Sequence, residues 1–159
     1  MKRSNQRGVT LLELMIVITI AGILISIALP ALQTMTLNSR ANSIFQDLQI
    51  DLMFARNLAT TNAKEVSITP FTNGWNEGWV ITQDNNEFRR RTVSAKAGEI
   101  SLADTNGDPQ ANFDFDKQGR AKASGTFKID IKGCTGSRNR EIKINGIGQL
   151  TVKESLCTQ

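Results

Sequence analysis

The chain opens with a long apolar segment. Residues 9–29 are mostly Leu, Ile, Val, Met and Ala, and the single charged residue among them is Glu13. A helix of this length spans about 31 Å, which matches the hydrocarbon thickness of a bilayer. The pattern therefore predicts a membrane-spanning helix. A cleaved secretory signal peptide is the competing interpretation, but such signals have a shorter apolar core.

A second, periodic pattern follows Pro30. Apolar residues recur at steps of three and four, the spacing of one helical face. They are Leu37, Ala41, Ile44, Leu48, Leu52, Ala55 and Ala59. We expect a single helix from about Thr10 to Thr61, with its first half in the membrane and this stripe packed against a sheet.

The rest of the chain has the alternation and the β-branched residues of strands, separated by turn signals rich in Asn, Asp and Gly. The predicted strands are residues 65–70, 78–83, 87–93, 111–115, 126–131, 140–145 and 148–152. One long helix followed by short strands predicts an α+β fold in which an antiparallel sheet wraps on the helix.

Charge is distributed unevenly along the chain. The formal net charge is +4, but residues 1–8 contain three of the 19 basic residues, so the remainder carries 16 basic and 15 acidic side chains. Residues 119–159 hold eight Lys or Arg and three Asp or Glu. The last quarter is thus a basic segment on a nearly neutral chain.

The inventory of reactive side chains is poor. The chain has no histidine, which removes the commonest general base and metal ligand, so we expect neither an enzyme nor a bound metal or cofactor. Its two cysteines, Cys134 and Cys157, predict one disulfide in an oxidising compartment. Two buried free thiols are the alternative.

The basic leader, Gly8, the stretch "VTLLE" and the apolar run to Pro30 closely resemble the class III signal of type IV pilins and pseudopilins. The resemblance implies that a prepilin peptidase cuts after Gly8 and methylates the amine of Val9, which stands where the family usually has Phe. Pro30 matches the helix-loosening proline of the family. The implied organisation is a leader at 1–8, a transmembrane part at 9–29 and a periplasmic domain at 30–159.

The resemblance also implies a role for Glu13, which would pair with the N-terminal amine of a neighbouring subunit. A carboxylate inside a bilayer costs about 3 kcal/mol unless it is partnered, so it marks function by default. A position near enough to the interface to reach water is the alternative, because Glu13 lies only about 7 Å beyond Gly8 by helical rise.

Within the class, residues 51–68, 73–84 and 113–121 resemble the GspH/FimT group of minor pseudopilins and minor pilins. This implies a non-enzymatic filament subunit, placed at a pilus tip together with other major and minor subunits and inserted in the bacterial inner membrane with its domain in the periplasm. DNA uptake and type II protein secretion are the alternative functions.

Three further motifs are interpreted as structural. Trp75 and Trp79 are expected to pack against the sheet edge. Residues 104–108, "DTNGD", look like the start of a calcium loop but lack its glutamate, and they predict a hairpin turn. Residues 89–91 are three arginines that alternate across a strand, and we interpret them as a solvated edge strand.

The basic C-terminal segment carries the DNA hypothesis. FimT-like proteins of transformable bacteria bind DNA through a Gly-Arg-x-Arg motif, and the corresponding residues here are Gly148-Gln149-Leu150-Thr151, without either arginine. Arg138 and Arg140 are nevertheless predicted to share a face, and Lys143 to join them. Clustered cations of this kind hold the phosphates of double-stranded DNA in a salt-dependent way.

Overall fold

The computed structural model describes residues 10–93, 99–131 and 134–157, so the predicted cleavage and methylation positions Gly8 and Val9 lie outside the described residues. It contains one helix, α1 (Leu11–Asn62), and eight strands. The strands are β1 (Val66–Phe71), β2 (Gly74–Gln83), β3 (Asn86–Thr92), β4 (Glu99–Asp104), β5 (Phe113–Phe115), β6 (Gly125–Asp130), β7 (Asn139–Ile144) and β8 (Leu150–Ser155). The chain divides into two compact units, Met1–Met35 and Thr36–Gln159.

The observed bounds of α1 agree with the predicted helix to within one residue. Thr10 precedes its first turn and acts as the N-cap, because its Oγ1 accepts a hydrogen bond from the backbone N–H of Glu13 at 3.2 Å. Pro30 lies inside the helix. At the other end, Ala63 has a φ of +51° and the Lys64 N–H donates to the carbonyl of Ala59, which terminates the helix in a Schellman arrangement.

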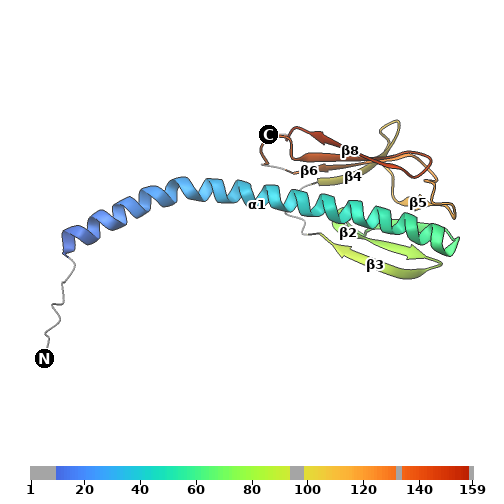
Figure 1. Ribbon diagram of the computed structural model, residues 1–159, viewed down its shortest axis with the longest axis horizontal. Helices are drawn as coiled ribbons and strands as arrows, with labels where there is room; N and C mark the ends of the chain where they lie inside the picture. The colour runs from blue at the N-terminus through green and yellow to red at the C-terminus, as the bar shows by residue number, and fades with distance from the viewer. Residues whose placement is uncertain (1–9, 94–98, 132–133, 158–159) are drawn as a thin grey trace, which may run out of the picture. The chain divides into compact units, whose positions relative to one another are not determined.

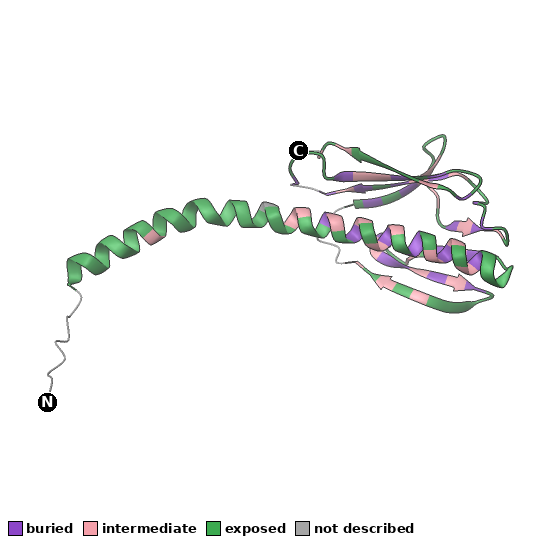
Figure 2. Cartoon of the chain, in the orientation of Figure 1, coloured by how far each residue is buried: buried purple, intermediate pink, exposed green. Residues whose placement is uncertain are grey.

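The second unit is built around the apolar stripe of α1. Six of the seven predicted stripe residues are fully buried, and Leu37 at the start of the stripe is half-buried. Removing a Leu or Ile side chain from water contributes about 1.5–3 kcal/mol. This burial therefore fixes the second half of α1 in the domain core, as Figure 2 shows by its alternating colours.

The structure confirms the expected α+β fold with an antiparallel β domain on the helix, and the strands form two sheets where one was expected. Their orders are β3-β2-β1-β5 and β4-β6-β7-β8, and all pairings are antiparallel. The two sheets lie on either side of the second half of α1 (Figure 1). Strand β4 was not predicted, because its sequence "EISLAD" offers only two apolar residues facing the core, Ile100 and Leu102.

Aromatic side chains join the two sheets where they meet. Trp75 of β2 packs edge-on against Phe127 of β6 with ring centroids 5.0 Å apart, and Phe113 of β5 lies 5.8 Å from the same ring. Trp75 and Trp79 are both buried, which confirms their predicted packing role. Edge-to-face pairs of this kind add stabilisation beyond the area that they bury.

The arginines of β3 correct the expectation of a solvated edge strand. Asp51 of α1 is fully buried, and its carboxylate accepts hydrogen bonds from Arg89 at 2.8 Å, from Arg91 at 3.1 Å and from Trp79 Nε1 at 2.9 Å. Because side chains alternate along a strand, Arg90 points to the other face, where it pairs with Glu87. The edge position of β3 was right, but two of its three arginines serve the core.

The Asp51 cluster fastens the edge strand to the helix. Burial alone raises the pKa of Asp51, but the hydrogen bonds from Arg91, Arg89 and Trp79 outweigh burial and hold that pKa below its ordinary value. The guanidinium of Arg89 also lies 4.0 Å above the ring of Phe54. Asp51 is therefore charged and fully satisfied at neutral pH.

We predict that Asp51→Asn lowers the free energy of unfolding by about 3 kcal/mol, because it leaves the partly buried guanidinium of Arg89 without a carboxylate and that of Arg91 with only Asp47, at 3.3 Å. Urea unfolding of the full chain in detergent, followed by the fluorescence of Trp75 and Trp79, measures the change. The folded-state pKa of Asp51 lies below its unfolded value of about 4, so its stabilisation is complete above that pH and is lost as the pH falls through the folded-state pKa. The difference in the free energy of unfolding between the wild type and Asp51→Asn should therefore disappear in acid.

Glu87→Gln is the matched control, because it removes an equivalent charge from the exposed pair with Arg90 on the other face of β3. Exposed pairs contribute little, so its urea midpoint should stay at the wild-type value. Equal midpoints for Asp51→Asn and the wild type at pH 7 would contradict the role of the cluster.

Candidate functional site

The first candidate site is the part of α1 that the other described residues leave exposed. The helix contains a stretch long and apolar enough to cross a membrane, and none of that stretch is buried. Figure 2 shows nearly all of this part in the colour of exposed residues. Exposed contiguous apolar surface of this size is rare on a soluble monomer, so it marks a site for lipid or for other proteins.

The polar residues of this stretch are accommodated within the helix. The hydroxyl of Thr19 donates to the carbonyl of Met15 at 2.7 Å, and Ser26 donates to Ile23 at 2.7 Å. Hydrogen bonds of this kind satisfy hydroxyl groups that have no water to bind in a lipid environment. The same surface is thus compatible with a bilayer along its length, with Glu13 as its one charged residue.

Glu13 stands in the first turn of α1, three residues after the N-cap Thr10. A negative charge is favourable at this end of a helix, because the unpaired N–H groups there carry partial positive charge. Among the described residues, Glu13 has no ion-pair partner. Its expected partner, the amine of Val9 on another subunit, lies outside the described chain, and that pairing stays a prediction.

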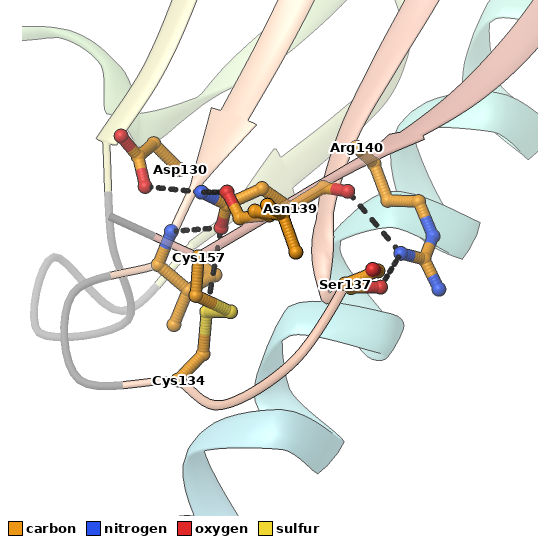
Figure 3. The surroundings of a disulfide bond; sticks show 8 residues. Asp130, Cys134, Ser137, Asn139, Arg140 and Cys157 are labelled. Carbon is orange, nitrogen blue, oxygen red and sulfur yellow. Dashed lines mark hydrogen bonds between the residues drawn. A yellow bond between two sulfur atoms is a disulfide. The ribbon is translucent and has the colours of Figure 1, made fainter. Parts of the chain in front are cut away.

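The second candidate site is the C-terminal region, which the predicted disulfide organises. The structure joins Cys134 to Cys157, with Cα atoms 5.7 Å apart (Figure 3). The Cys157 N–H donates to the carbonyl of Gly136. Buried Asn139 lies beside this bond. Its side chain accepts from the N–H of Ile131 at 2.9 Å and donates to the carbonyl of Leu156 at 3.1 Å, so it links the loop to the C-terminal segment.

The three residues predicted to contact DNA are not brought together. Arg138 is exposed in the loop before β7. Arg140 is drawn inward, where it pairs with Glu154 at 3.1 Å and donates to the carbonyl of Ser137 at 2.7 Å (Figure 3). Lys143 has the opposite parity on β7 and points to the outer face of the sheet. The predicted shared face was therefore wrong for Arg140.

The outer face of this sheet instead carries three exposed lysines. Lys128 of β6 and Lys153 of β8 both lie opposite Glu141 of β7. Lys143 lies two residues beyond Glu141 on the same face of β7. None of these lysines forms an ion pair within the part of the chain that the structure describes. We call them the outer-face lysines. Lys128 and Lys143 line a cleft of about 310 Å³, which the turn after β4 closes on one side.

That turn is the "DTNGD" motif, and the predicted hairpin turn is confirmed. The Asp104 carboxylate accepts from the N–H groups of Asn106 and Asp108 at 2.8 and 2.9 Å, and Gly107 supplies a φ of +93°. The carboxylate is thus engaged by its own backbone. No group of three potential metal ligands occurs among the described residues.

Gly148, in the place of the first motif glycine, has a structural role. It adopts a φ of +75°, and a Cβ atom there would come within 2.0 Å of the carbonyl oxygen of Gly119. Arg56 of α1 donates to that carbonyl at 3.0 Å and to the carbonyl of Ile147 at 3.1 Å. The helix therefore holds two turns together, and sequence patterns gave no signal for this role of Arg56 because its partners lie far along the chain.

Comparison with known proteins places this geometry in a family. The family model described as "Type II transport protein GspH" matches residues 45–148, and that described as "Prokaryotic N-terminal methylation motif" matches residues 3–29. The chain belongs to the GspH family. Members of this family are pilin-type structural subunits and not enzymes, which confirms the class expected from the sequence.

Solved structures confirm the fold of this GspH-family chain. Two crystal structures of the type IV minor pilin FimU of Pseudomonas aeruginosa, in space groups P21 and P65, each match with a TM-score of 0.57. Their identities are 19% and 18%, and they cover 79% and 74% of this chain and 98% and 99% of FimU. No match emerges among curated proteins. The likeness to FimU establishes a type IV pilin fold, a long helix with two antiparallel sheets.

Proposed function

We propose that this chain is a minor filament subunit that joins a pilus or pseudopilus through the first half of α1. The observation that carries the proposal is the unburied apolar surface of this stretch, with one carboxylate in its first turn. The match of residues 3–29 to the N-terminal methylation motif supports it. The chain is trimmed after Gly8 by a prepilin peptidase, methylated at Val9 and held in the inner membrane until assembly.

The orientation in the membrane follows from the flanking charges. Lys2, Arg3 and Arg7 precede the apolar stretch, and positive residues stay on the cytoplasmic side. The Thr36–Gln159 unit then lies in the periplasm, an oxidising compartment that suits the Cys134–Cys157 disulfide. We place the subunit at the filament tip, where minor subunits contact one another.

Glu13 is the proposed assembly contact. Cleavage creates an ammonium group at Val9, about one helical turn from the carboxylate. In a filament, the ammonium of one subunit meets the carboxylate of the next in a medium of low dielectric constant, where their attraction is far stronger than in water.

Two assemblies use this arrangement. The GspH description fits a type II secretion pseudopilus, and the FimU fold fits a type IV pilus. Gly8, Val9 and Glu13 have the same proposed roles in both assemblies. The identity of the genes that flank this one in its genome distinguishes the two assemblies.

We predict that Glu13→Gln leaves membrane insertion and leader removal unchanged but reduces incorporation into filaments at least about tenfold. The substitution keeps the shape of the side chain and removes the charge that the neighbouring ammonium requires. Immunoblots of sheared filaments and of membranes from the native host measure the ratio of the protein in filaments to the protein in the membrane.

Glu87→Gln is the control, since it removes one exposed acid from the second unit and leaves α1 untouched. Its filament-to-membrane ratio should equal that of the wild type. A normal ratio for Glu13→Gln would sink the proposed contact, whereas loss of the protein from the membrane would show that Glu13 acts before assembly.

A second candidate function is the binding of double-stranded DNA, which the outer-face lysines favour. Three exposed ammonium groups on adjacent strands hold phosphates without base specificity. We predict that the full chain in detergent retards duplex DNA at low salt. The double variant Lys128→Gln/Lys143→Gln should lower the slope of log affinity against log salt by about two.

Arg140→Gln is the comparison variant for DNA, because Arg140 is already paired with Glu154 and its loss should not change the slope. Absence of a retarded band at the lowest salt dismisses the DNA function. A band that depends on Arg140 and not on Lys128 and Lys143 contradicts the assignment to the outer face.

A further inference from the structure

A polar cavity of about 360 Å³ lies in the second unit, where α1 ends and the β2–β3 hairpin turns back. Its lining consists of Asn62, Lys64, Gln83, Asp84, Asn86 and Phe88. None of these side chains takes part in the proposed assembly contact or belongs to the outer-face lysines. The volume is at the lower end of the range of small-molecule sites, which suits a ligand of one or two rings.

The walls of the cavity are preformed. The hairpin turns through Asp84 and Asn85, which both have positive φ (51° and 63°) and so form the tight two-residue turn typical of twisted hairpins. Beside this turn, Asn62 Nδ2 donates to Gln83 Oε1 at 2.6 Å, and Gln83 Nε2 donates to the carbonyl of Lys64 at 3.4 Å. Gln83 is only 4% exposed, so this link is part of the core.

Phe88 is the one apolar side chain of the lining, and a bulge sets its direction. In the β2–β3 pairing, Ile81 lies opposite Arg89 and Thr82 lies opposite Glu87, so Phe88 has no partner residue. Bulges re-aim a side chain and are frequent beside functional sites. Phe88 keeps 46% of its surface exposed and presents an aromatic ring to an otherwise polar cavity.

The chemistry of the lining favours a neutral ligand rich in hydroxyl groups. The two charged residues of the cavity, Lys64 and Asp84, neutralise each other in an ion pair, which leaves no net charge to attract an ion. Asn62 and Asn86 carry exposed amide groups, and an amide both donates and accepts, as a hydroxyl group does. An exposed aromatic ring offers a flat apolar surface beside them.

From these features we propose that the cavity binds a neutral saccharide. The apolar C–H face of a pyranose ring lies on Phe88, and its hydroxyl groups exchange hydrogen bonds with the amides of Asn62 and Asn86. This site is separate from filament assembly, so its presence and the assembly role of Glu13 stand or fall independently.

Saturation-transfer NMR on the full chain, in a zwitterionic detergent without sugar headgroups, tests the proposal. The probes are glucose, galactose, mannose, N-acetylglucosamine and lactose, with glucose 6-phosphate and glucuronic acid as charged counterparts. We expect transfer onto the ring C–H protons of at least one neutral saccharide, with a millimolar dissociation constant. The charged counterparts should bind no more tightly.

Phe88→Leu and Phe88→Tyr form the decisive pair of variants. Leucine keeps an apolar side chain but removes the flat ring, so it should weaken binding at least about tenfold, whereas tyrosine should stay within about threefold of the wild type. Ile147→Ala removes an exposed apolar residue from the β7–β8 turn and should leave binding unchanged. Urea midpoints verify that each variant is folded.

Three outcomes overturn the proposal. They are no transfer to any neutral saccharide, equal affinity for Phe88→Leu and the wild type, and tighter binding of glucose 6-phosphate than of glucose. The first removes the site, the second removes the ring from it, and the third shows that the ligand is recognised by charge.

Discussion

One helix has to satisfy two different surroundings, and the rest of the structure depends on that constraint. In its second half, α1 buries a stripe of Leu, Ile and Ala between two sheets, and this burial holds the domain together. In its first half the same helix exposes Leu and Ile on all sides, and none of the described residues buries them. The second half therefore has its apolar stripe buried within the domain, whereas the apolar surface of the first half can leave water only by contact with lipid or other proteins.

The two halves of α1 each carry a carboxylate in an apolar setting. Asp51 is buried and satisfied by Arg89, Arg91 and Trp79, and its function is to fix an edge strand to the helix. Glu13 sits in an apolar stretch with no ion-pair partner among the described residues. Two carboxylates of one helix thus have different roles. Asp51 stabilises the fold, whereas Glu13 has no ion-pair partner within the described fold.

The sequence predicted the parts of the structure that depend on local periodicity. The apolar run at 9–29 and the 3.6-residue spacing of the stripe after Pro30 together located α1 to within one residue at each end. The alternation of residues 126–131 and 140–145 located β6 and β7. The same reasoning missed β4, because two core-facing apolar residues in six are too weak a pattern. It also misassigned Arg89, Arg91 and Arg140, since their acidic partners lie 38, 40 and 14 residues away in sequence. Long-range ion pairs leave no periodic signal.

The central claim is that a solitary acid near the start of a lipid-embedded helix meets a newly made amine on the adjacent protomer. Mass spectrometry of the N-terminal peptide, taken from the protein in native membranes, tests whether that amine exists. We predict a peptide that begins at Val9 and carries one methyl group on its N-terminal amine. A peptide that begins at Met1, or at any residue beyond Pro30, would contradict it.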